Sequence, residues 1–262
     1  MGMKNKINLR PIPAAPYFTV REHQFALRKE TSWPLGELKT SLEDHLRVLF
    51  SIPPEFHFKL VEVSGNPKDS LDNINIKDHP ETGIVWSGSQ AETDALITLD
   101  MSYSFPILPA SYDGVGAIYI DPQFSLGVDC GVCAFFFRDE MMFSFESQQP
   151  DNRLLKLLDL VLGDILQKGS GQVLREANYK AAVLNNLIEQ SPHLSFVVAN
   201  GNLRSKTMIV ALCPIELANK IYELGYHVAV EPHGDSAKIT IANYPTHSKE
   251  LIEMFADSLA LL

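Results

Sequence analysis

The chain has 262 residues, of which 45% are hydrophobic and 21% are charged, and its formal net charge is −10. This length and composition are typical of a globular protein with one large domain or two modest ones. The negative charge argues against nucleic acid and against an anionic membrane surface as partners, because both require a basic face.

The chain begins with a proline-rich segment, residues 1–34, for which we expect extended, turning backbone. It carries no apolar leader, and no later stretch approaches transmembrane length, so we expect a cytoplasmic protein. Leucines at helical spacing then predict an amphipathic helix over 35–50. A strand over 56–63 follows and leads into the turn Ser64-Gly65-Asn66-Pro67.

The middle of the chain holds three short apolar runs, at 95–101, 115–120 and 131–137. Each run is long enough for a buried strand and too short for a helix. Together with the strand at 56–63 they predict a mixed sheet in an α/β large domain, residues 35–150. We expect the turns between these strands to carry the chemistry.

From Asp151 onward the pattern changes to long helices followed by alternating strands and helices, which predicts a C-terminal α+β domain over 151–262. A helix at 151–168 is expected to stop at Gly169-Ser170-Gly171 before a second helix at 172–190. The later elements are predicted as strands at 196–199, 208–212, 228–230 and 238–242, and helices at 214–225 and 248–261.

Cys130 and Cys133 form a CxxC pattern within the third apolar run. Residues i and i+3 of a strand face opposite sides, and Cys213 is the only other thiol, whereas a structural zinc site needs four ligands. We therefore interpret the cysteines as buried apolar residues in a reducing compartment, with a redox or metal role as the alternative.

Three motifs resemble a known family. The segment Asp100-Met101-Ser102, the strand around Gly116-Ala117-Ile118-Tyr119 and the turn Gln123-x-x-x-Gly127 follow one another as in phosphoserine aminotransferases. These are pyridoxal-phosphate (PLP) enzymes of fold type I. The resemblance implies a truncated form of that fold, shortened in the large domain between 67 and 93, and it extends to Ile241-Ala242-Asn243-Tyr244 in the small domain.

The resemblance also implies site residues. In the family, an Asp like Asp100 pairs with the pyridinium nitrogen, and a Lys directly after a Gln like Gln123 forms the Schiff base. This chain has Phe124 in that place, and no lysine occurs between Lys77 and Lys156. Because phenylalanine can neither form an imine nor transfer a proton, we expect no transamination by this chain alone.

The resemblance implies further contacts to the cofactor and substrate. Ser102, Gln123 and the turn at Ser64 and Gly65 are candidates for holding a phosphate or a substitute anion. Lys238 and His233 are candidates for a substrate carboxylate, although Lys lacks the bidentate fork of Arg. The alternatives are a turn or cap role for Asp100, local backbone hydrogen bonds for the hydroxyl and amide groups, and a solvated loop histidine.

Three functional hypotheses follow. The first is a catalytically silent aminotransferase-like protein used for binding or assembly, with either no cofactor or non-covalent PLP. The second is a PLP-dependent transferase whose lysine comes from elsewhere, and the third is acid–base chemistry centred on Asp100. We further expect a homodimer, as the resemblance implies, and a small anionic ligand.

Overall fold

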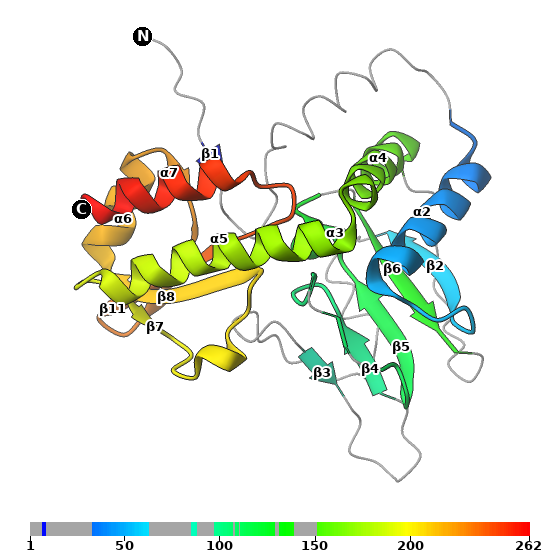
Figure 1. Cartoon of the computed structure of the whole chain (residues 1–262), viewed down its shortest axis with the longest axis horizontal. Coiled ribbons are helices and arrows are strands. Elements are labelled where there is room, and N and C mark those ends of the chain that lie inside the picture. Colours follow the sequence, from blue (N-terminus) through cyan, green and yellow to red (C-terminus); the bar gives the residue numbers. More distant parts are fainter. Residues whose placement is uncertain are drawn as a thin grey trace.

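The computed structural model describes residues 7–8, 33–62, 85–87, 97–106, 108–109, 111–128, 131–138 and 151–262. These residues form two main sheets, each with helices packed against it (Figure 1). The predictions for Ser64, Gly65 and Cys130 lie outside the described residues.

The first sheet has five strands: β2 (His57–Glu62), β3 (Val85–Ser87), β4 (Ile97–Asp100), β5 (Val115–Ile120) and β6 (Val132–Phe137). Their order is β2-β6-β5-β4-β3. Strands β4 and β5 are parallel, and the other neighbouring pairs are antiparallel. The sheet is therefore mixed, which confirms the prediction made from the short apolar runs. Every residue of β5 is buried, as expected for a continuous apolar run.

Two helices pack together against this sheet, α2 (Leu35–Phe50) and α4 (Asn152–Lys168) (Figure 1). The leucines that predicted α2 face the core: Leu38, Leu42, Leu46 and Leu49 are buried. Asp151 caps α4 by accepting a hydrogen bond from the Arg153 N–H at 2.8 Å. The helical spacing and the capping residue thus determine both elements as predicted.

The second sheet is antiparallel, in the order β10-β11-β8-β7. Its core includes residues of three helices. The strands are β7 (Ser195–Phe196), β8 (Met208–Pro214), β10 (Ala229–His233) and β11 (Ser236–Ala242), and the helices are α5 (Ser170–Gln190), α6 (Ile215–Glu223) and α7 (Lys249–Ala260). A separate parallel pair joins β1 (Ile7–Asn8) to β9 (Tyr226–His227).

The break between α4 and α5 is shorter than predicted. Only Gly169 leaves the helical conformation, with φ 80° and ψ 141°, and α5 begins at Ser170. Glycine adopts this positive φ without steric cost, so one residue is enough to redirect the chain. The two helices therefore follow one another directly, from the first sheet to the second (Figure 1).

Hydrogen bonds connect the two sheets near the carboxyl ends of β4 and β5. The Thr207 hydroxyl donates to the Phe105 carbonyl, and the Thr246 hydroxyl donates to the Leu126 carbonyl at 2.9 Å. Both donors come from the C-terminal part, and the acceptors lie in the loop after β4 and in the helix that follows β5. Within the described residues, no helix is long and apolar enough to cross a membrane.

Candidate functional site

Two buried carboxylates stand at the carboxyl ends of the parallel strands. Asp100 is the last residue of β4, and Asp121 follows β5 directly. Their exposed fractions are 2% and 6%. The carboxyl ends of parallel strands meet at one edge of a sheet, which is where α/β proteins commonly bind ligands. The structure thus brings Asp100 to the expected edge together with Asp121, which we did not predict.

Local backbone groups occupy part of this carboxylate edge. The Ser102 N–H donates to Asp100 Oδ1 at 2.9 Å, so Asp100 closes a short turn. The Asp121 N–H donates to Ser102 Oγ at 2.9 Å, which ties the two strand ends together. Asp100 and Ser102 therefore lie close together, and both serve the local structure.

Tyr119 adds a third acidic group beneath the two carboxylates. Its hydroxyl lies 3.0 Å from Cys133 Sγ and 3.5 Å from Asp121 Oδ2. Burial, and then the nearby Cys133, Asp121 and Asp100, raise the pKa of the Tyr119 hydroxyl well above its ordinary value of 10.0. The tyrosine therefore stays protonated. Among the described residues, no group of three or more His, Cys, Asp or Glu side chains could hold a metal ion.

A short helix, α3 (Pro122–Leu126), occupies the segment that we interpreted as a turn. Asp121 caps it by accepting the Gln123 N–H at 2.9 Å, and Pro122 is its first residue. An Asp-Pro pair followed by a glycine five residues later is a helix signal that the sequence already contained. The predicted anion-binding residue Gln123 is half-buried in the first turn of this helix.

Phe124 packs into a small hydrophobic cluster between the two sheets. Its ring centroid lies 5.1 Å from that of Tyr103. It also packs against the cluster formed by Tyr103, Met208, Ala242 and Tyr244. The position where the resembling family carries an amine is therefore part of an apolar contact between the sheets.

Gly127 caps the carboxyl end of α3 and lies against the Tyr244 ring. Gly127 has φ +73°, and a Cβ atom placed there would lie 2.5 Å from Tyr244 Cδ2. Both the backbone conformation and the close approach require glycine. The last residue of the Gln123-x-x-x-Gly127 motif thus has a packing role in this chain.

A buried lysine holds the Tyr244–His247 turn from the other side. Lys180 of α5 is 1% exposed, and its Nζ donates to the carbonyls of Tyr244 and His247 at 2.7 and 2.8 Å. Burial lowers the pKa of Lys180 from 10.5 to about 7. Burial and then Lys180 also lower the pKa of His247 well below 6.5. The sequence did not point to Lys180, because a single lysine on a helix is expected to be exposed to solvent.

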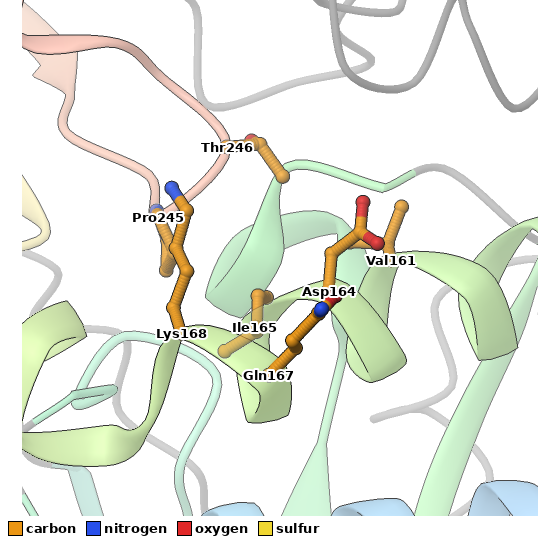
Figure 2. Close-up of a pocket in the computed structure, with 7 residues that line it drawn as sticks. All are labelled: Val161, Asp164, Ile165, Gln167, Lys168, Pro245 and Thr246. Atoms are coloured by element: carbon orange, nitrogen blue, oxygen red, sulfur yellow. The ribbon is translucent and has the colours of Figure 1, made fainter.

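The outer side of the same turn borders a pocket of about 250 Å³. Figure 2 shows Lys168 on one side of the opening and Asp164 on the other, with Ile165 between them. The lining residues are Val161, Asp164, Ile165, Gln167, Lys168, Pro245 and Thr246. The pocket is therefore made by the last two turns of α4 and by the Tyr244–His247 turn.

The two predicted substrate residues lie elsewhere on the second sheet. Lys238 Nζ pairs with Glu231 Oε2 at 2.6 Å, and His233 is exposed at the end of β10. Lys238 is four residues before Ala242 on the same strand, or roughly 13 Å at ~3.3 Å per residue. The structure thus brings Asp100, Ser102 and Gln123 to one edge and places Lys238 and His233 away from Phe124.

Comparisons with known proteins identify the fold. No family model and no curated protein matches the chain. Solved structures do: a phosphoserine aminotransferase from Cytophaga hutchinsonii has a TM-score of 0.78 at 20% identity and covers 98% of this chain and 99% of its own. A PLP-bound phosphoserine aminotransferase from Trichomonas vaginalis has a TM-score of 0.73 at 13% identity, covering 97% and 99%.

A NifS-like protein from Rickettsia africae is also similar, with a TM-score of 0.68, 12% identity and coverage of 98% of this chain and 100% of its own. At such low identities these likenesses define the fold. The chain thus has a PLP-dependent aminotransferase fold, with phosphoserine aminotransferases as structural neighbours, as its motifs predicted.

The residues at the sheet edge do not fit covalently bound PLP. Phe124 has no amine, and its partly buried ring packs against an apolar cluster. Asp100 and Ser102 are present, but each is hydrogen-bonded within the loop. The pyridine ring of PLP could contact the carboxylate of Asp100, but position 124 offers no lysine to which PLP could bind covalently.

Proposed function

We propose that this protein is a catalytically silent member of the aminotransferase fold that acts as a binding or assembly protein. Phe124 carries the proposal, because the side chain at this position can form no imine with an aldehyde. Its packing against Tyr103 gives it a structural role in place of a chemical one.

The environment of Phe124 supports this proposal beyond the missing amine. Phe124 is partly buried and packs against the apolar cluster that contains Met208 and Ala242. A lysine in its place would lose the apolar contacts of the ring, so the surroundings favour an apolar side chain. The residues around position 124 thus suit a phenylalanine, and the substitution Phe124→Lys alone would not create a cofactor site.

The second hypothesis, a lysine supplied from elsewhere, has one observation in its favour. Lys180 has a lowered pKa, and an unprotonated amine is the reactive form of lysine. Its Nζ, however, already donates to two backbone carbonyls beneath the Tyr244–His247 turn. A reaction at Lys180 would require this turn to open, and we therefore rank the hypothesis second.

The third hypothesis, acid–base chemistry at Asp100, rests on its neighbours. Asp100 and Asp121 are both buried at the same sheet edge, above a Tyr119 that stays protonated. Pairs of carboxylates can divide acid and base roles when their surroundings differ. Within the described residues the same groups also close turns and cap α3, and this favours a structural role.

Absorbance spectroscopy with added PLP tests the proposed function. The protein is mixed with a slight excess of PLP, passed through a desalting column and scanned between 300 and 500 nm, roughly the region in which PLP absorbs. We expect the protein fraction to carry no PLP band. A retained band that changes on addition of an amino acid would contradict catalytic silence and favour the second hypothesis.

We also propose a cytoplasmic homodimer that binds a small anionic ligand rather than nucleic acid. The dimer is supported by the fold type I resemblance, because those enzymes build their sites across a subunit interface. The net charge of −10 disfavours a polyanionic partner. Light scattering at micromolar concentration should give twice the chain mass of 29.2 kDa, and a monomer mass would contradict the dimer.

A further inference from the structure

The pocket between α4 and the Tyr244–His247 turn is separate from the carboxylate edge. It has about 250 Å³ of space, and its lining includes the apolar residues Val161, Ile165 and Pro245. Pockets for drug-sized ligands usually span about 300–1,000 Å³. The size therefore suits a compact ligand with a short apolar part.

Opposite charges stand at the two ends of this pocket. Asp164 and Lys168 are four residues apart on α4, so they lie on the same face of the helix. Figure 2 shows their charged ends on opposite sides of Ile165. A ligand with one charge would be attracted at one end and repelled at the other, whereas a ligand with both charges would be attracted at both ends.

Lys168 retains the capacity to bind a ligand carboxylate. Its ion pair with Glu176 is long, with 3.6 Å between Lys168 Nζ and Glu176 Oε2, and the Lys168 side chain is 53% exposed. An ammonium has three donors, so it can serve Glu176 and a second carboxylate together. The cationic end of the pocket is thus accessible from solvent.

The wall opposite α4 is held in place before any ligand arrives. Lys180 fixes the Tyr244 and His247 carbonyls, and the Thr246 hydroxyl donates to Leu126 O. The Asn243 amide also donates to the Ala177 and Lys206 carbonyls, at 3.1 and 2.8 Å. A wall that is already ordered loses little entropy on binding, which favours affinity for a small ligand.

We infer that this pocket binds a small zwitterion whose ammonium and carboxylate are separated by a short apolar chain. The ammonium lies against Asp164, the apolar chain over Ile165, and the carboxylate against Lys168. The site is independent of the proposed function, since it uses none of the residues at the carboxylate edge.

Three matched probes test the inference: 4-aminobutyrate, butylammonium and butyrate. They share a four-carbon chain and differ only in which charged groups they carry. We expect 4-aminobutyrate to shift the backbone amide NMR signals of Ile165, Lys168 and Thr246 and to bind at least about tenfold more tightly than either singly charged probe. Alanine, whose charges are adjacent, should bind more weakly than 4-aminobutyrate.

Substitutions separate the two ends of the site. Lys168→Gln and Asp164→Asn should each weaken 4-aminobutyrate binding at least about tenfold, whereas Lys220→Gln, at an exposed lysine of α6, should leave it unchanged. Equal affinity for all probes would overturn the inference. So would the absence of shifts at about 10 mM 4-aminobutyrate, which is ten times a 1 mM Kd. The probe comparison uses the unmodified chain and does not depend on how the variants fold.

Discussion

The ring of Phe124, on helix α3, lies in the contact between the first sheet and the second. It packs against a cluster of Tyr103 from the loop after β4, Met208 and Ala242 from the second sheet, and Tyr244 from the turn after β11. A side chain in this position contributes to stability through its apolar contacts. A lysine in its place would lose those apolar contacts.

Substitution of Phe124 measures this contribution. We expect Phe124→Lys to lower the free energy of unfolding by about 1–3 kcal/mol, because it removes the apolar contacts of the partly buried ring. Phe124→Met, which keeps an apolar side chain, should cost less than about 1.5 kcal/mol. Urea unfolding of both variants checks the expectation, and a Phe124→Lys protein as stable as the unmodified one would contradict the packing role.

Gly127 offers a second test at the level of one residue. Gly127→Ala should destabilise the protein by about 2–4 kcal/mol, because the new Cβ meets the Tyr244 ring in addition to the backbone strain at positive φ. Gly114 is a matched control, since it has the same φ of +73° and a Cβ atom added to it would meet nothing within 4 Å. Gly114→Ala should therefore cost only about 1 kcal/mol. Equal losses in thermal or urea unfolding would show that the contact with Tyr244 is unimportant.

At the level of elements, the hydrogen bonds of Lys180 hold the Tyr244–His247 turn against α5, and we call this contact the clamp. The lowered pKa of Lys180 makes the clamp sensitive to pH. Glu176 on the same helix favours its charged form, whereas Lys168 of α4 and Lys249 of α7 oppose it. Burial outweighs these effects and lowers the pKa to about 7 from the value of 10.5 that applies to the unfolded chain. Between these two pH values the unfolded state binds more protons than the folded state, so stability rises with pH.

Unfolding free energies at several pH values between 7 and 10 test this clamp. We expect Lys180 to add stability with rising pH at up to about 1.4 kcal/mol per unit. Lys180→Met should remove this slope, and near pH 10 it should lower stability, because two buried carbonyls lose their donor. Lys220→Met, at an exposed lysine of α6, should keep the slope of the unmodified protein. The raised pKa of the Cys213 thiol acts in the opposite direction near pH 9, so the difference between variants is the informative quantity.

Most elements could be predicted from the sequence because their signals are local. The leucine spacing predicted α2 as 35–50, as observed, and the three apolar runs predicted β4, β5 and β6. The helix α3 was missed because five residues are too few for a periodic pattern, although Asp121-Pro122 marked its start. The two-residue strands β1 and β9 depend on pairing across the whole chain, which no local pattern reports.

The candidate site was predictable only in part, for a related reason. Asp100 and Ser102 could be placed at a strand end, because the apolar run stops there. Asp121 beside them, Tyr244 over Gly127 and Lys180 under the turn all come from distant segments. Such contacts depend on how the two sheets meet, which motifs within one segment do not specify.

At the scale of the whole molecule, the chain has the aminotransferase fold, and Phe124 takes part in the contact between its two sheets. Phe124 packs across this contact, and hydrogen bonds from Thr207 and Thr246 reinforce it. Fold and function can separate in this way, because function belongs to the site and the core maintains the fold. Under the proposed function, the protein is expected to be stable without a cofactor.

Borohydride trapping with PLP tests the proposed silence most directly, because reduction fixes PLP permanently wherever an imine has formed. The unmodified protein and the Phe124→Lys variant are treated with PLP and borohydride, and the modified peptides are identified by mass spectrometry. We expect no specific pyridoxyl group on the unmodified chain, and at most partial labelling of the new lysine without transamination. A stoichiometric pyridoxyl group on the unmodified chain, at Lys180, Lys238 or another single lysine, together with a spectral change on addition of an amino acid, would contradict catalytic silence.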